Sequence, residues 1–118
     1  MGLDQFAYTR ANQNQPEFIW RKHAKLQEFM EALYRLKNKV ESAEGLNCGE
    51  LELTAADIST LQTFVECRAL PTSPGGFFFG HEYQDETAEE YRDQDLKFCA
   101  WAKQVLETRQ QVFYSCWW

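Results

Sequence analysis

The sequence predicts a single α+β domain over residues 1–118, in which three helices pack on a small, mostly antiparallel sheet. A chain of 118 residues suits one domain. Three segments repeat apolar residues at the spacing of an amphipathic helix, and short segments between and beyond them have the pattern of strands. We expect the first and last strands to lie side by side in the sheet.

The first half of the chain predicts a strand, a long helix and a second short strand. Residues 5–10 alternate Phe6 and Tyr8 with smaller or polar residues, as a half-buried strand does. Pro16 suits a first helical turn, and residues 17–42 predict one helix of about six to seven turns that crosses the domain. Its apolar face would carry Leu26, Phe29 or Met30, Leu33, Leu36 or Lys37, and Val40. Residues 50–53 then alternate again as a short strand.

The second half predicts two further helices and a buried terminal strand. Thr54 and Asp57 form a capping arrangement for a helix that runs to about residue 67. Its core face would carry Ile58, Leu61, Phe64 and Val65. Residues 85–108 predict a third helix with one stripe through Tyr91, Asp95, Phe98 and Ala102. Residues 112–118 are β-prone and almost wholly apolar, which favours a paired, buried strand.

The least ordinary segment is residues 70–80, which read L-P-T-S-P-G-G-F-F-F-G. A strand facing water on one side would alternate apolar and polar residues, whereas three phenylalanines stand here in a row. The segment predicts a short strand that is buried on both faces or lines a pocket, with glycines allowing close backbone approach. Pure core and pocket lining are equally compatible with the pattern.

Composition excludes several classes of function. The net charge is −6, with a basic first third and a strongly acidic remainder, so nucleic-acid binding through bulk electrostatics is not expected. The four cysteines are scattered without a C-x-x-C pair, and the chain shows neither a signal segment nor an apolar run of membrane-spanning length. We expect reduced thiols, a cytoplasmic location, no membrane association, no metal site and no cofactor.

The strongest candidate for ligand binding is Trp20-Arg21-Lys22-His23, with Lys25 following. On a helix, Arg21 and Lys25 would lie one turn apart, and Trp20 and His23 would share a neighbouring face. Aromatic rings stack on bases and cations meet phosphate, so the grouping suits a nucleotide-like ligand. The alternative interpretation is a solvated basic face with Trp20 in the core.

The glycines and aromatic residues of two other segments complete the expected site. His81 follows the phenylalanine run, where pocket residues are often found, although a lone loop histidine is more often merely exposed. The expected ligand-binding residues are Trp20, Arg21, Lys22, His23, Lys25, Gly76, Phe77, Phe78, Phe79, Gly80, His81, Tyr114 and Trp117. No catalytic constellation follows from the spacing, so we expect no enzyme. An enzyme acting on a nucleotide, with His23 and His81 as the bases, stays open as an alternative.

Seven acids crowd residues 82–95, with one arginine among them. A solvated helix face that keeps the protein soluble is the preferred interpretation. The alternatives are a surface that mimics nucleic acid toward a partner protein, or an edge that binds metal.

Several motifs together resemble a family of small, largely uncharacterised proteins of bacteriophages and bacteria. They are M-G-L-D, W-R-K-H, L-P, G-F-F-F-G, an acidic helix with D-L and a terminal W-W, in the family's order over nearly the full length. The family's first helix runs W-R-K-x-N-x-L-H-x-W, whereas Ala24, Gln27 and Phe29 replace its Asn, His and Trp here. The resemblance implies a phage protein acting in the host cytoplasm, and no established activity.

Together these observations predict a non-enzymatic phage protein that sequesters a small, nucleotide-like immune signal of the host. Aromatic residues would stack on the bases, cations would neutralise phosphate, and Gly75, Gly76 and Gly80 would let backbone N–H groups approach it. The alternative is an inhibitor or adaptor that uses its acidic helix to block a basic surface of a host protein. The excess of aromatic residues favours a homo-oligomer.

Overall fold

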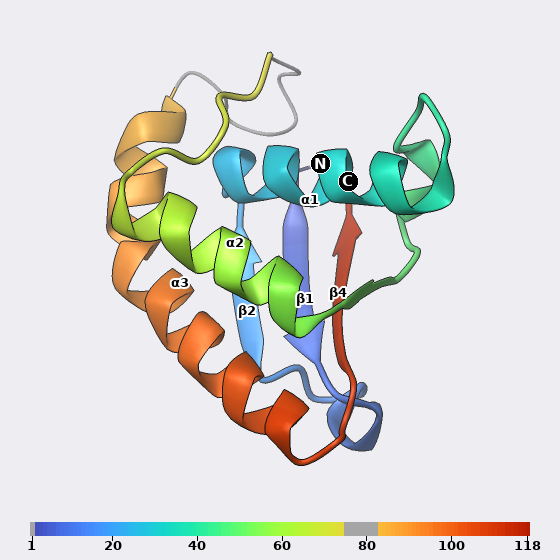
Figure 1. The fold of residues 1–118 in the computed structure, drawn as a ribbon. Coiled ribbons are helices and arrows are strands. Elements are labelled where there is room, and N and C mark those ends of the chain that lie inside the picture. Colours follow the sequence, from blue (N-terminus) through green and yellow to red (C-terminus); the bar gives the residue numbers. More distant parts are fainter. Residues whose placement is uncertain (1, 75–82) are drawn as a thin grey trace.

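The sheet has four antiparallel strands in the order β2-β1-β4-β3. We describe residues 2–74 and 83–118 of a computed structural model (Figure 1). The strands are β1 (Asp4–Tyr8), β2 (Phe18–Arg21), β3 (Leu51–Leu53) and β4 (Val112–Trp117). The helices of the described residues are α1 (Ala24–Asn38), α2 (Ala55–Glu66) and α3 (Gln84–Glu107), with two short 3₁₀ turns. The predicted α+β fold is confirmed, and so is the pairing of the first and last strands.

The predicted helix over residues 17–42 is wrong at both ends. Its first part is strand β2, which pairs with β1 and places Trp20 opposite Gln5. Helix α1 begins only after His23, whose side chain accepts a hydrogen bond from the Leu26 N–H and so caps the helix. It ends at Lys39, which adopts the left-handed conformation with φ 55° and donates its backbone N–H to the Arg35 carbonyl.

The shorter helix changes which apolar residues reach the core. Leu26, Phe29 and Met30 are buried as predicted. Leu36, by contrast, is 76% exposed, and Val40 lies beyond the helix and is 45% exposed. The last turn of α1 therefore projects past the core, although its apolar spacing continues.

The other elements lie close to their predicted bounds. Thr54 and Asp57 form a reciprocal capping box at the start of α2, as predicted. Ile58, Leu61 and Val65 are buried on this helix, and the predicted stripe of α3 faces inward. The phenylalanine run of residues 77–79 lies outside the described residues.

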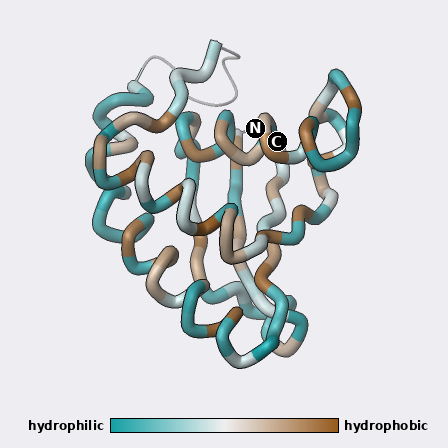
Figure 2. Tube along the Cα trace, in the orientation of Figure 1, coloured by the Kyte–Doolittle hydropathy of each residue, from teal (hydrophilic) through white to brown (hydrophobic). Residues whose placement is uncertain are grey.

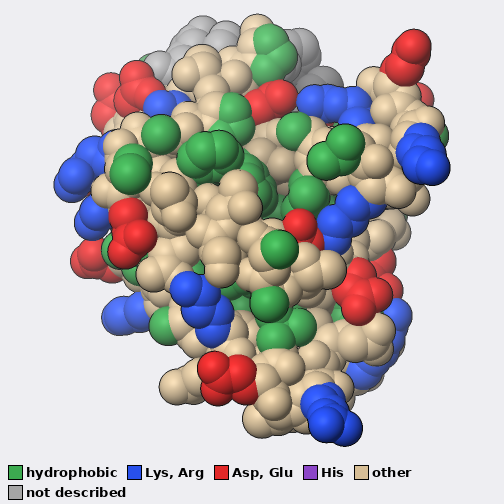
Figure 3. Space-filling model, viewed as in Figure 1, with side chains coloured by type: hydrophobic (Ala, Val, Ile, Leu, Met, Phe, Trp, Pro, Cys, Tyr) green, Lys and Arg blue, Asp and Glu red, His purple; other side chains and the backbone are tan. Residues whose placement is uncertain are grey.

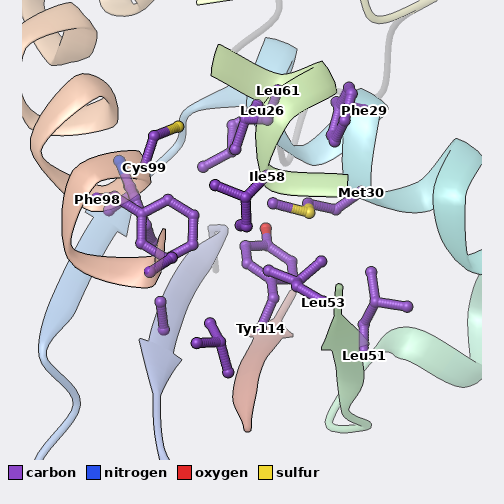
Figure 4. Close-up of a cluster of buried hydrophobic side chains, with 14 of the residues drawn as sticks. Leu26, Phe29, Met30, Leu51, Leu53, Ile58, Leu61, Phe98, Cys99 and Tyr114 are labelled. Carbon is purple, nitrogen blue, oxygen red and sulfur yellow. The ribbon is translucent and has the colours of Figure 1, made fainter. Parts of the chain in front are cut away.

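The helices pack over one face of the sheet and enclose the core with it (Figure 1). Apolar positions recur along each helix at intervals, between stretches of hydrophilic residues (Figure 2). Ile58 of α2 lies among Leu26, Leu61 and Met30, near the ring of Tyr114 on the central strand β4 (Figure 4). Aromatic contacts extend this core, since Phe98 meets the ring of Trp20 edge to face at 5.2 Å between centroids.

Side chains from the helices satisfy backbone groups on both edge strands. On β2, the Arg21 N–H donates to the Tyr91 hydroxyl (2.9 Å) and the Ile19 carbonyl accepts from Gln94 (2.7 Å). On β3, the Glu52 carbonyl accepts from Lys37 Nζ at 2.7 Å. These bonds occupy edge groups that another strand would need, which disfavours growth of the sheet by strand addition.

Candidate ligand-binding site

The two faces of the sheet differ in what covers them. Along β1, Gln5 and Ala7 are fully buried and face the helices, so the alternate residues Asp4 and Phe6 face the other way. None of the described α-helices covers this second face, which we call the open face. Neighbours along one strand therefore occupy very different surroundings, and the predicted site residues divide between the two faces.

On the covered face, a buried carboxylate organises the first group of predicted residues. Asp95 of α3 is 1% exposed, and its two oxygens accept one hydrogen bond each. Trp20 Nε1 donates to Oδ1 and His23 Nε2 lies against Oδ2, both at 2.8 Å. The two bonds join β2 and the start of α1 to the middle of α3, and they satisfy a charge that would otherwise be costly to bury.

His23 has no free nitrogen to offer a ligand. It is fully buried, and its Nδ1 accepts the Leu26 N–H that caps α1, so the proton resides on Nε2 and is donated to Asp95. Tyr91 stacks on the ring at 5.3 Å between centroids. Because both nitrogens and one ring face are engaged inside the protein, this histidine acts as a structural residue.

Tyr114 belongs to the same buried polar system. Its hydroxyl accepts from Gln5 Nε2 at 3.0 Å and donates to Gln27 Oε1 at 2.5 Å. Gln5 also exchanges two hydrogen bonds with the His23 backbone, which connects this group to the cap of α1. Burial raises the pKa of Tyr114 well above its ordinary value, so the phenol stays protonated and can donate.

On the open face, Arg21 and Trp117 gather around Asp4. The register pairs Asp4 with Arg21 on one side and with Trp117 on the other, so the three side chains share this face. They line a hollow of about 320 Å³ together with Gly2 and Trp118. Trp117 is 62% exposed, so its ring presents a large apolar surface to a ligand in the hollow.

The charged groups at this hollow are loosely held. Arg21 Nε lies 3.5 Å from Asp4 Oδ1, and the two side chains are 76% and 39% exposed, so their attraction is weak. Lys22 adopts φ 56°, and its Cε lies 3.1 Å from where a Cβ on Gly2 would stand. The stem of Lys22 therefore runs beside the hollow, and both cations are available to an incoming anion.

The neighbouring tryptophan is fixed in place. Asn47 accepts from the Trp118 N–H at 3.0 Å and donates to the Trp118 carbonyl at 3.4 Å. The Trp118 ring packs partly against the core. One wall of the hollow is thus anchored, whereas Trp117 stands free of the core.

A second hollow at the far end of the open face is already saturated. It measures about 350 Å³ and includes Arg10, Tyr8 and Glu50. Arg10 makes bonds of 2.6 and 2.9 Å to the Glu50 carboxylate and lies 4.1 Å above the Phe113 ring centroid. Tyr8 donates to the same carboxylate, and burial together with Glu50 raises the pKa of the phenol to about 12. These groups satisfy one another and leave little for a ligand.

Lys25 lies away from Arg21, in a cavity where the three helices meet. The predicted spacing of one helical turn between these two cations is wrong, because Arg21 belongs to β2 and only Lys25 belongs to α1. Lys25 makes a 2.6 Å ion pair with Asp85. The cavity measures about 220 Å³ and also includes Arg68, Glu89, Arg92 and Asp95.

The helix-covered side of the molecule also carries an apolar groove. Hydrophobic side chains gather between α1 and α2 (Figure 3), where a groove of about 460 Å³ is lined by Phe29, Leu33, Leu36, Phe64 and Pro71 among others. The exposed Leu36 stands at this groove. The predicted homo-oligomer stays a prediction.

The structure thus brings together Arg21, Lys22 and Trp117, and it separates them from the buried Trp20, His23 and Tyr114. Gly76, Phe77, Phe78, Phe79, Gly80 and His81 lie outside the described residues. Sequence reasoning missed Asp4, Gly2 and Trp118. Had F-I-W-R been interpreted as a strand with Trp20 in the core, alternation would have placed Arg21 on the face away from the core. The local spacing of residues does not reveal which strand pairs with β2.

Residues 2–74 and 83–118 contain neither a metal-binding cluster nor a membrane-spanning helix. No group of three or more His, Cys, Asp or Glu side chains is arranged to hold a metal ion. Among the helices of these residues, none has the length and apolar character needed to cross a bilayer. All four cysteines are free thiols in the structure, with Cys48 and Cys67 exposed.

Comparison with known proteins yields no relative. No protein-family model matches the chain, and no curated protein or solved structure is similar to it at a significant level. The resemblance to small phage and bacterial proteins stays a prediction.

Proposed function

We propose that this protein binds a small, planar, anionic molecule of the nucleotide class in the hollow of the open face. The observation that carries the proposal is an exposed tryptophan beside an arginine on a sheet face without helices. Trp117 is 62% exposed, and the cross-strand register places it and Arg21 on either side of Asp4.

Each wall of the hollow would serve a different part of such a ligand. A base stacks on a tryptophan ring, a contact worth about 1–3 kcal/mol. Arg21 presents a planar fork of donors that suits phosphate, and Lys22 adds a second cation beside Gly2. Asp4 accepts N–H donors on the edge of a base, which would favour bases with an exocyclic amino group.

The biological role we propose is sequestration rather than turnover. His23 is buried with both nitrogens occupied, so it is not available as a general base, and a hollow lined by stacking and charged groups supplies affinity for a nucleotide. With the resemblance to phage proteins, this supports a protein that removes a nucleotide-like immune signal from the host cytoplasm.

Isothermal titration calorimetry with a panel of linear and cyclic nucleotides tests the proposal. We expect at least one of them to bind the wild type, and Trp117→Ala to weaken binding by about tenfold or more, the loss expected for one stacked base. Arg21→Gln should weaken the binding of phosphorylated ligands and leave the binding of the matching nucleoside unchanged. Leu36→Ala, on the opposite side of the molecule, is the matched control for loss of an exposed apolar side chain.

Two results would end the proposal. One is the absence of heat with every nucleotide at millimolar concentration. The other is binding that Trp117→Ala and Arg21→Gln leave unchanged while circular dichroism shows both variants folded.

A second candidate function, blocking a basic surface of a host protein, has one supporting observation. Glu86, Glu90 and Asp93 lie on one face of α3, are exposed, and make no ion pair with the described residues. Asp85 and Glu89 are paired with Lys25 and Arg68, so the acidic surface is smaller than the sequence suggests. Joint neutralisation of Glu86, Glu90 and Asp93 should abolish capture of a host protein and its dependence on salt.

A further inference from the structure

We infer that the cavity between the three helices is a second binding site, one that takes the phosphoryl group of a small phosphorylated molecule. It lies among α1, the end of α2 and the first half of α3, on the opposite side of the sheet from Trp117. Three cations from these three regions line it, namely Lys25, Arg68 and Arg92. Convergence of cations from separate elements is the arrangement that anion sites use.

Arg92 is the residue that most favours an anionic ligand in this cavity. Its Nε is buried and makes no hydrogen bond within the described part of the chain. Only a weak bond from Nη2 to the Glu66 carbonyl, at 3.3 Å, holds the guanidinium on the side of α2. An unsatisfied buried donor is costly, so an acceptor supplied from outside would remove that cost.

The other two cations are occupied by carboxylates that a ligand can displace. Lys25 contacts Asp85 at 2.6 Å, yet the Asp85 side chain is 81% exposed. Arg68 makes a two-pronged bond to Glu89, with both side chains about 60% exposed at 61% and 59%. The Arg68–Glu89 pair is exposed on both sides and contributes little, so a stronger anion would replace Glu89 at small cost. Lys25 is 16% exposed, but its partner Asp85 is exposed to water and can give up its place to a stronger anion. Asp85 and Glu89 thus mark positions that phosphoryl oxygens would take.

The charge balance favours a dianion over a carboxylate. The cavity contains three cations and three acids, and Asp95 cannot move away because Trp20 and His23 hold both its oxygens. A carboxylate would only exchange one monoanion for another. A phosphoryl dianion brings more charge and three terminal oxygens, enough for Lys25, Arg68 and Arg92 together. The walls formed by Val65, Leu70 and Ala88 would contact the organic part of the ligand.

Calorimetry with inorganic phosphate and glycerol 3-phosphate, with acetate and sulfate as comparison anions, tests the inference. We expect saturable binding of both phosphates at millimolar concentration or tighter, with glycerol 3-phosphate the tighter because its carbon chain contacts the apolar wall. Arg92→Gln should weaken binding about tenfold, and Arg92→Lys nearly as much, since it keeps the charge but removes the buried Nε. Arg109→Gln, beyond the far end of α3, is the matched control.

The outcomes separate this site from the nucleotide hollow. Trp117→Ala should leave phosphate binding unchanged, because Trp117 lies on the open face. Absence of heat with both phosphates overturns the inference, and so does equal binding by wild type and folded Arg92→Gln. Equal affinity for acetate and phosphate overturns the assignment to phosphoryl groups. None of these results bears on nucleotide binding at Trp117.

Discussion

Trp20 and Trp117 lie on the two faces of the same sheet and have opposite surroundings. Trp20 faces the helices, is fully buried and donates its N–H to Asp95, whereas Trp117 faces outward and is 62% exposed. Arg21 follows Trp20 directly along the strand and turns to the open face with Trp117. Strand alternation, rather than residue type, therefore separates the structural aromatic residues from those available to a ligand.

The largest expected effect comes from breaking the covered face at Asp95. Asp95→Ala leaves the Trp20 and His23 donors buried without an acceptor, and we expect the free energy of unfolding to fall by about 3 kcal/mol. Urea denaturation followed by circular dichroism measures it. Asp93→Ala, exposed on the same helix, should change the free energy by less than about 0.5 kcal/mol. Equal effects of the two substitutions would show that Asp95 does not organise this face.

Alkaline pH should lower the free energy of unfolding, because two thiols are buried on the same covered face. Burial raises the pKa of Cys99 and of Cys116 to about 12, whereas the unfolded thiols titrate near their ordinary value of about 8.5. Between these values the folded state holds more protons than the unfolded state, so stability falls as the pH rises. We expect each of the two thiols to contribute a loss of about 2 kcal/mol in the free energy of unfolding between pH 8 and pH 10, measured from urea midpoints.

A matched pair of cysteine substitutions tests whether the buried thiols cause this fall of stability with pH. Cys116→Ala should flatten the fall with pH because it removes one buried thiol, and Cys67→Ala should not, because Cys67 is exposed. A midpoint that stays constant from pH 8 to pH 10 in the wild type would contradict the account.

A smaller effect is expected from the hydroxyl at the centre of the buried network. Tyr114→Phe removes the bonds to Gln5 and Gln27, and we expect a loss of about 1–2 kcal/mol in the free energy of unfolding. Tyr83→Phe is the control, since Tyr83 is 65% exposed. A Tyr114→Phe protein as stable as the wild type would mean that the two glutamines satisfy each other without the phenol.

The smallest effect on stability is expected on the open face. Trp117→Ala removes a side chain that contributes little to the core, so the free energy of unfolding should change by less than about 0.5 kcal/mol. The same substitution should have a large effect on ligand binding. A loss of several kcal/mol would indicate instead that Trp117 serves the fold, and it would weaken the proposed hollow.

The fold class could be predicted from the sequence because most elements carry local signals. Thr54 and Asp57 mark the start of α2, and the stripe through Asp95 and Phe98 marks the inner face of α3. The strand at Trp20 could not be predicted in this way. This segment is a strand because it pairs with β1, where Trp20 lies opposite Gln5. Such pairing between two segments leaves no signal in the residue spacing of either one.

The candidate site was predicted in part for the same reason. Arg21, Lys22 and Trp117 were expected to bind a ligand, and the structure places Arg21 and Trp117 at one hollow, with the Lys22 stem beside Gly2 at its edge. Arg21 and Lys22 were grouped with Trp20 and His23 because the whole segment was expected to be a helix. In the structure Trp20 and Arg21 belong to strand β2 and face opposite ways. The place of Asp95 in the apolar stripe indicated that it is buried. Its bonds to Trp20 and His23 could not be predicted, because they join segments more than 70 residues apart.

The most direct test of the account is an NMR titration of ¹⁵N-labelled protein with adenosine monophosphate and related nucleotides. We predict that the largest shifts fall on the amides of Asp4, Arg21 and Trp117 and on the Trp117 indole N–H. The Trp20 indole N–H, held by Asp95, should hardly move. Shifts confined to the cavity of Lys25 and Arg92, or no shifts with any nucleotide at millimolar concentration, would contradict the assignment of ligand binding to the open face.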